Sequence, residues 1–225
     1  MINNKSVLAI TLARGGSKGI PKKNIIDIHG KPLLQYTIDE VKKSKYIDHY
    51  IVSTDDDEIK KLCKDLDQTY FDRKPVDDTQ KSSDGLLEVL GVMNKPYYIV
   101  EIMCTNPLKT SEDIDGVIEK IDELEADTVC SVVRVWDYHP SRIKFLDDEG
   151  KMEDVYPEIP ETRRQDLNPP AYIRNGSIYA MTWSHLQLHG TRYDKNTVAY
   201  IMPEDRTINI DEPIDLELAK LLIWN

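Results

Sequence analysis

The sequence predicts an α/β fold with a mostly parallel, doubly wound sheet. Short apolar runs of strand length alternate with segments of about 10–15 residues in which apolar positions recur at helical spacing. This alternation is typical of parallel strands that are covered by helices on both faces. Several strand-length runs end directly in glycine-rich or polar loops, which is where an open parallel sheet binds ligands. With 225 residues, the chain is expected to form one domain, residues 1–225, that carries an insertion.

The first strand is expected at residues 7–12, a continuous apolar run that ends at glycines and suits the centre of a parallel sheet. The next elements repeat the alternation. In chain order they are a helix over residues 32–44, a strand at 50–53, a helix over 59–66, a short strand at 68–71, a helix over 83–93 and a strand at 97–103. A capping-box pattern at Thr110 and Asp113 then predicts a helix that runs to Ile121, followed by a strand at residues 128–135.

The pattern changes over residues 136–174, which we interpret as an insertion. Helical periodicity disappears, five prolines appear, and residues 147–150 are typical of a hairpin turn. Connections in compact domains are usually about 4–6 residues long. An excursion of this length therefore favours a function such as a lid or a subunit contact, and a plain surface excursion is the alternative.

The alternation resumes after the insertion. A strand is expected at residues 177–181, a short helix at 183–188, a strand at 198–202 and then a final helix. Pro213 is well suited to the first position of that helix. The apolar residues expected to be buried by this helix are Ile214, Leu218, Leu221 and Leu222.

Charge and cysteine content narrow the class of protein. The chain has 40 acidic and 29 basic residues and a net charge of −11, which argues against binding to nucleic acid or to an anionic membrane. Cys63, Cys104 and Cys130 are odd in number and widely separated, so we expect buried free thiols in a reducing compartment rather than disulfides or a zinc site. The apolar run at residues 7–13 is too short to span a bilayer. We therefore expect a cytoplasmic protein.

The loop at residues 12–24 concentrates positive charge and glycine. It carries Arg14, Lys18, Lys22, Lys23 and three glycines, without any acidic residue. Glycines let backbone N–H groups approach an anion closely, and the cations supply charge that a triphosphate needs. The spacing fits neither the P-loop nor the dinucleotide fingerprint. We expect a phosphate-binding loop, and a basic surface turn remains the alternative.

Asp211 is a candidate metal ligand near the end of the chain. A nucleoside triphosphate with Mg²⁺ needs a carboxylate opposite a basic loop, because this metal takes carboxylate and phosphate oxygens together. Asp211 fits equally well as the N-cap of the final helix, since Pro213 follows closely. The three aspartates at residues 55–57 are expected to be caps and turn residues rather than metal ligands.

A second group of cations lies in the insertion. It contains Arg142, the tandem Arg163 and Arg164, and Arg174. Tandem arginines in a proline-rich segment are more often surface residues. With Gln165 beside them they would instead suit a carboxylate, because the planar guanidinium donates two parallel hydrogen bonds. Both interpretations stay open, and the chain shows no nucleophile motif that would indicate covalent catalysis.

The loop at residues 12–24, taken with four later motifs, resembles the acylneuraminate cytidylyltransferases, which make CMP-sialic acid and CMP-activated relatives such as legionaminic acid. The later motifs are Val52-Ser-Thr-Asp55, Arg163-Arg-Gln165, Asn175-Gly-Ser-Ile-Tyr179 and Ile208-Asn-Ile-Asp211. All of them occur in the order of the family. The resemblance implies a Rossmann-like nucleotidyltransferase sheet and a homodimer formed through a β-rich insertion. It also implies a reaction that joins CTP to a nine-carbon 2-keto sugar acid with release of pyrophosphate.

The resemblance assigns roles to individual residues. The implied nucleotide-binding residues are Leu12, Ala13, Arg14, Gly15, Lys18, Lys23, Asn24, Arg73 and Ser82. The implied sugar-binding residues are Met103, Thr105, Arg142, Arg163, Arg164, Gln165 and Tyr179. The implied catalytic residues are Arg14, Lys23, Arg164 and Asp211. Mg²⁺ is the expected cofactor, with Asp211 as its ligand and Asn209 as a weaker candidate, and Arg142 and Arg164 would act across the dimer.

Three positions depart from the pattern of the family. Asn209 stands where the family usually has an aspartate, which favours one metal ion rather than two. Met103 replaces a glutamine that family members use on the sugar, and Arg192 with Tyr193 replaces an aromatic pair. Together these changes favour an acidic sugar other than N-acetylneuraminate. Two alternatives remain: a CTP-dependent transferase for Kdo or another anionic acceptor, and a non-catalytic nucleotide-sugar-binding protein.

Overall fold

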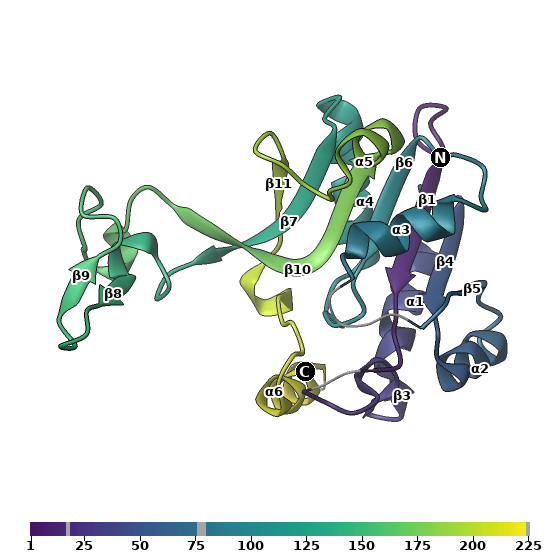
Figure 1. Cartoon of the computed structure of the whole chain (residues 1–225), viewed down its shortest axis with the longest axis horizontal. Coiled ribbons are helices and arrows are strands. Elements are labelled where there is room, and N and C mark those ends of the chain that lie inside the picture. The colour runs from purple at the N-terminus through teal and green to yellow at the C-terminus, as the bar shows by residue number, and fades with distance from the viewer. Residues whose placement is uncertain (17–18, 76–79, 224–225) are drawn as a thin grey trace.

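A seven-stranded sheet between two layers of helices forms the body of the protein (Figure 1). The computed structural model describes residues 1–16, 19–75 and 80–223. The strands of the sheet are β1 (Val7–Leu12), β4 (His49–Thr54), β5 (Tyr70–Asp72), β6 (Tyr98–Ile102), β7 (Thr128–Val135), β10 (Ala171–Thr182) and β11 (Val198–Ile201). Their order is β11-β7-β10-β6-β1-β4-β5, and each neighbouring pair is parallel except the two pairs made by β10. The predicted mostly parallel α/β fold is confirmed.

Helices cover both faces because strand side chains alternate between them. The helices are α1 (Leu33–Lys43), α2 (Asp57–Asp65), α3 (Ser82–Leu90), α4 (Ser111–Glu123), α5 (Trp183–His189) and α6 (Pro213–Ile223). On β1, Val7 and Ala9 pack in the apolar cluster that contains α4, whereas Leu8 and Ile10 pack in the cluster that contains α3. Thus α3 and α5 lie on one face, and α1, α2 and α4 lie on the other (Figure 1).

Two helix starts follow the capping rules that the sequence predicted. The Asp56 carboxylate accepts hydrogen bonds from the backbone N–H groups of Glu58 at 2.9 Å and Ile59 at 3.0 Å, which caps α2. At α4, Thr110 and Asp113 form a reciprocal capping box. These local side-chain bonds fix where each helix begins and hence where the preceding loop ends.

The segment after β7 forms an arm that projects away from the sheet (Figure 1). β7 and β10 continue outward as an antiparallel ribbon, in which Ala171 pairs with Val135 and Arg174 with Val132. Beyond the ribbon, β8 (Lys144–Leu146) and β9 (Met152–Asp154) pair as a hairpin. The last residues of the predicted insertion therefore belong to a sheet strand, β10, which is longer than the predicted strand at residues 177–181.

The prediction for the buried side of α6 is wrong. Ile214 and Leu221 are 72% and 66% exposed, and Leu218 and Leu222 are exposed as well. The buried stripe instead contains Leu216 and Ala219, which pack with Ile28, Leu33, Ile208 and Ile210. The helix lies at the margin of the body and contacts it along one narrow stripe, so most of its apolar positions stay outside.

The helices of the described residues include none that is both long enough and apolar enough to cross a membrane. Two short strands, β2 (Asp27–Ile28) and β3 (Lys31–Pro32), pair beside α6 and lead into α1. They place the end of the loop at residues 12–24 next to the segment that precedes α6. The two termini lie at opposite ends of the body: the N-terminus lies near the start of β1, and the C-terminus lies at α6 (Figure 1).

Candidate functional site

A cavity of about 610 Å³ opens beyond the carboxyl ends of β1, β5 and β6. Its walls are formed by Leu12, Arg14, Gly19, Lys23, Asn24, Arg73, Gln80, Lys81, Ser82, Met103, Cys104, Thr105, Gly176, Asn209, Asp211 and Glu212. This is the edge at which open parallel sheets bind their ligands. The walls carry several cations although the chain as a whole is acidic, which suits an anionic ligand.

Most residues assigned to the nucleotide lie in this cavity. The residues that line it are Leu12, Arg14, Lys23, Asn24, Arg73 and Ser82. Ala13 lies beneath the wall, fully buried, with its N–H donated to the Ser53 carbonyl at 2.9 Å. The Gly15 N–H donates to the Asp55 carboxylate at 3.0 Å. Lys18 lies outside the described residues.

Two glycines of the loop are required by close contacts. A Cβ atom on Gly15 would lie 2.5 Å from Asp56 Oδ2, and one on Gly19 would lie 2.7 Å from the Asp211 carbonyl oxygen. Both distances are far shorter than a carbon–oxygen contact allows. The glycines therefore let the loop pass close to the start of α2 on one side and to the segment before α6 on the other.

Lys23 connects the loop at residues 12–24, the first loop of the chain, with the segment that precedes α6. Its side chain is only 14% exposed, and its Nζ donates to the Ile210 carbonyl at 2.7 Å and to Asp211 Oδ1 at 2.8 Å. The neighbouring Lys22 has a left-handed backbone, with φ of 54°, and its ammonium instead pairs with Glu58 on α2. Lys23 therefore faces the cavity, whereas Lys22 is held outside it.

The carboxylate of Asp211 faces the cavity rather than the helix. It accepts hydrogen bonds from Lys23 and from the Asn209 amide. Another residue, Asp215, caps the start of α6. Its Oδ2 accepts hydrogen bonds from the backbone N–H groups of Asp211 at 3.0 Å and Glu212 at 2.8 Å. The side-chain geometry thus leaves Asp211 available to a ligand and gives the capping role to Asp215.

Arg73 is a buried cation in the wall between β5 and α3. It is 6% exposed, and its Nε has no hydrogen-bond partner among the described residues. Burial lowers the pKa of the guanidinium, while Asp55 and Glu88 act in the opposite direction. An unpaired donor on a buried side chain that lines the cavity is suited to a polar ligand group, because leaving such a donor unsatisfied is costly.

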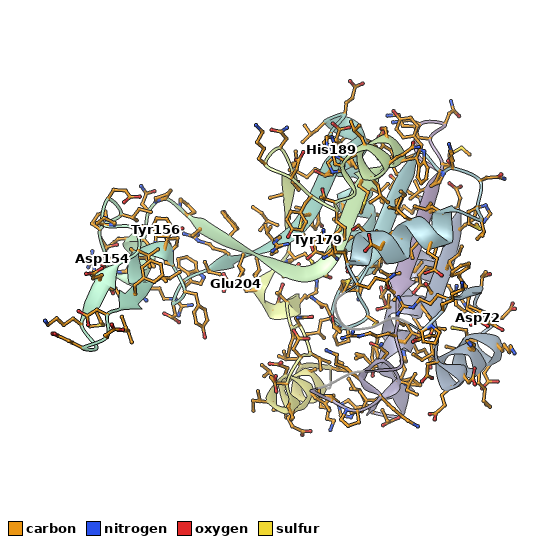
Figure 2. All side chains as sticks on the ribbon, viewed as in Figure 1. Asp72, Asp154, Tyr156, Tyr179, His189 and Glu204 are labelled. Carbon is orange, nitrogen blue, oxygen red and sulfur yellow. The ribbon has the colours of Figure 1, made fainter. Side chains whose placement is uncertain are left out.

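The residues assigned to the sugar divide into three groups. Met103 and Thr105 line the cavity at the end of β6. Tyr179, marked on β10 in Figure 2, lies outside the cavity walls, 5% exposed, under the Arg192 guanidinium at 4.4 Å. Arg192 in turn pairs with the fully buried Glu101 at 2.7 Å. Burial raises the pKa of the Glu101 carboxyl, and the Arg192 charge counteracts that shift.

The third group lies on the arm. Arg142 pairs with Asp137 at 3.0 Å, Arg163 pairs with Asp166 at 2.8 Å, and Gln165 is exposed. The Arg164 guanidinium lies over the Trp136 ring at 5.4 Å. These side chains do not line the cavity of their own chain. The spacing of these residues in the sequence did not predict their distance from the cavity, because it does not show that the segment extends as an arm.

Several residues of the cavity were absent from the predicted set. They are Gly19, Gln80, Lys81, Cys104, Gly176 and Glu212. The positions of three of them could have predicted a place in the cavity. Gln80 and Lys81 directly precede α3, and Cys104 is the second residue after β6. Residues just after strands and just before helices gather at one edge of such a sheet.

A glycine-rich basic loop, a buried arginine and a carboxylate around one cavity at this edge are the features of an α/β protein that binds a phosphorylated nucleotide. Comparison with known families gives the narrower class. The chain belongs to the cytidylyltransferase family, whose model matches residues 8–221.

Two relatives are named for different sugar acids. The chain is 31% identical over 208 residues to the N-acylneuraminate cytidylyltransferase of Streptococcus agalactiae serotype V, a match that covers 91% of this chain and 50% of the relative. It is 29% identical to the pseudaminic acid cytidylyltransferase of Campylobacter jejuni, over 96% of this chain and 95% of that protein. The chain thus spans about half the length of the streptococcal relative and nearly all of the Campylobacter one.

Solved structures share the fold. A CMP:2-keto-3-deoxy-manno-octonic acid synthetase complexed with CTP matches with a TM-score of 0.73 and 18% identity, over 97% of this chain and 98% of that one. A 4-diphosphocytidyl-2C-methyl-D-erythritol synthase from Anaerococcus prevotii matches with a TM-score of 0.67 and 17% identity, over 98% and 99% of the two chains. At these identities the likeness establishes the fold.

Proposed function

We propose that this protein joins CTP to a nonulosonic, sialic-type 2-keto sugar acid and releases pyrophosphate. The observation that carries the proposal is the meeting of the basic glycine-rich loop with Asp211, through Lys23, in one cavity of a cytidylyltransferase fold. The named relatives act on sialic and pseudaminic acids, which supports an acceptor of that class.

In the proposed reaction the anomeric hydroxyl of the sugar attacks the α-phosphate of CTP. Arg14 and Lys23 hold the triphosphate and stabilise the negative charge that develops on it, a positioning and electrostatic role. Leu12, Asn24, Arg73 and Ser82 surround the nucleoside part. The buried Arg73 offers its unpaired Nε to the nucleotide.

The donor set fits a single Mg²⁺ that is held mainly by the substrate. Asp211 supplies a carboxylate and Asn209 an amide oxygen, and the described residues contain no group of three or more His, Cys, Asp or Glu side chains that could hold a metal ion. Mg²⁺ is commonly bound by one or two carboxylates together with phosphate oxygens. The ion would neutralise triphosphate charge in the transition state.

The acceptor side of the proposal includes a second subunit. The arm exposes Phe145, Leu146 and Met152, which are 63%, 69% and 73% exposed, as expected of a surface that pairs with another chain. A homodimer formed through the arms would bring Arg142 and Arg164 of one subunit to the other subunit's cavity. There they would bind the sugar carboxylate, next to Met103 and Thr105.

A pyrophosphate-release assay tests the reaction and the substrate class together. The protein is incubated with CTP, Mg²⁺ and each of a panel of acids: N-acetylneuraminate, pseudaminic acid, legionaminic acid and Kdo. We expect pyrophosphate with CTP and a nine-carbon acid, and weaker turnover of N-acetylneuraminate than of another nonulosonic acid. Turnover of Kdo alone would favour the eight-carbon alternative, and binding of CTP without any pyrophosphate would favour a non-catalytic protein.

Mixed dimers test whether the arm acts across the interface. Lys23→Ala and Arg164→Ala are each expected to be nearly inactive alone. Co-expression of the two variants should restore about a quarter of wild-type activity, because half of the randomly assembled dimers would contain one cavity with both native side chains. Purification through two different tags isolates that dimer. If Arg164 acts within its own chain, the mixture will stay inactive.

A further inference from the structure

Cys104 lies at the point where the loop after β6 meets the first loop. Two backbone hydrogen bonds hold the chain on either side of it: the Met103 N–H donates to the Ser177 carbonyl at 2.9 Å, and the Ile210 N–H donates to the Thr105 carbonyl at 2.8 Å. The position of the Cys104 side chain is therefore fixed by β10 on one side and by the segment before Asp211 on the other.

The Cys104 thiol makes a directed hydrogen bond to the cavity wall. Its Sγ donates to Asn24 Oδ1 at 3.0 Å, and Asn24 Nδ2 donates to the Arg14 carbonyl at 2.8 Å. Cys104 and Asn24 are 3% and 6% exposed. The thiol and the Arg14 carbonyl thus occupy both ends of the Asn24 amide, which fixes its orientation and ties down the backbone at Arg14.

The thiol is suited to donate rather than to react. Burial raises the pKa of Cys104 to about 11, so the sulfur stays protonated near neutral pH. The buried Lys109, whose amine donates to Thr37 Oγ1 at 2.9 Å, lies close enough to influence it electrostatically. Burial also lowers the pKa of Lys109 to about 7, so this neighbour is less fully charged than an ordinary lysine near neutral pH.

We propose that Cys104 is a positioning residue for the triphosphate: through Asn24 it holds the first loop in the conformation that presents Arg14 to the phosphates. This inference rests on the proposed function, because it assigns the ligand of the first loop to CTP. The Cys104 thiol does not need to touch the reacting atoms. The link should therefore affect CTP binding and leave acceptor binding unchanged.

The test compares Cys104→Ala, Cys104→Ser and Cys63→Ala by calorimetric binding of CTP and by separate KM values for CTP and the sugar acid. Cys63 is a matched control, because it is buried in the same apolar cluster as Cys104 and lies on α2. The thiol is a weak donor, but Cys104→Ala leaves the buried Asn24 Oδ1 without this partner, which should raise the Kd for CTP about fivefold with the KM for the sugar unchanged. Cys104→Ser, which keeps a donor, should bind CTP within about twofold of wild type.

Each outcome is decisive. Cys63→Ala is expected to lower the melting temperature without changing the Kd for CTP, which would separate loss of packing from loss of the link. The inference is overturned if wild type binds CTP but Cys104→Ala binds it equally well, or if the serine variant is impaired as much as the alanine variant. Failure of wild type to bind CTP at all would instead contradict the proposed function.

Discussion

Lys23→Ala is expected to lower kcat/KM for CTP by about 100- to 1000-fold, the usual loss when one preorganised electrostatic donor is removed from a reaction centre. The ammonium of Lys23 is largely enclosed and lies between the first loop and Asp211. It can therefore stabilise charge on the triphosphate with little screening by water. Initial rates of pyrophosphate release at varied CTP concentrations measure the loss.

Lys22→Ala is the matched control for this prediction. Lys22 precedes Lys23 directly, but its exposed side chain pairs with Glu58 outside the cavity. An exposed ion pair contributes little, so this variant should keep activity within about twofold of wild type. Equal losses in the two variants would show that the loop needs only its total charge, and retained activity in Lys23→Ala would remove the assigned role of Lys23.

Strand periodicity and local capping account for most of the fold that could be predicted. The apolar runs at residues 7–12 and 128–135 coincide with β1 and β7, and Thr110 begins α4 as its capping box indicates. Such signals are local, because they depend on neighbours within one turn or one strand. The buried side of α6 depends instead on what lies beside the helix. Apolar residues occur on several sides of α6, but the body of the protein contacts only one of those sides. The sequence alone therefore assigned Ile214 to the wrong side.

The candidate site shows the same division. Residues that follow parallel strands were expected at one edge, and the structure brings Arg14, Arg73 and Met103 into one cavity from β1, β5 and β6. The direction of an individual side chain could not be predicted from spacing. Lys22 and Lys23 are adjacent in sequence and point to different partners, and Arg164 lies on an arm rather than beside Arg14.

One continuous segment connects the arm with the cavity. At the base of the arm, Trp136 Nε1 donates to Glu204 at 2.7 Å; Figure 2 marks Glu204 there. Arg206 then pairs with the buried Asp113 of α4 at 2.7 Å, and the chain continues to Asp211. In the proposed dimer, a partner subunit that fixed the arm would also fix the base of the segment that carries Asp211.

Asp211→Ala is expected to raise the Mg²⁺ concentration required for half-maximal pyrophosphate release by at least about tenfold, equivalent to about 1.4 kcal/mol. In the proposed site the Asp211 carboxylate would bind the ion directly, while its hydrogen bonds to Lys23 and Asn209 hold it in place. Titration of Mg²⁺ at saturating CTP measures the change. The melting temperature should fall little, because the carboxylate is largely exposed and its ion pair contributes little to folding.

Asp215→Ala should give the opposite pair of results. Its carboxylate accepts from the backbone N–H groups of Asp211 and Glu212 at the start of α6. Losing that cap should cost about 1 kcal/mol and lower the melting temperature by about 2–4 °C for a chain of this size. The Mg²⁺ titration should stay close to that of wild type. If Asp211→Ala lowers only the melting temperature and leaves the Mg²⁺ titration unchanged, Asp211 belongs to the helix and the metal must be held by the triphosphate and other groups.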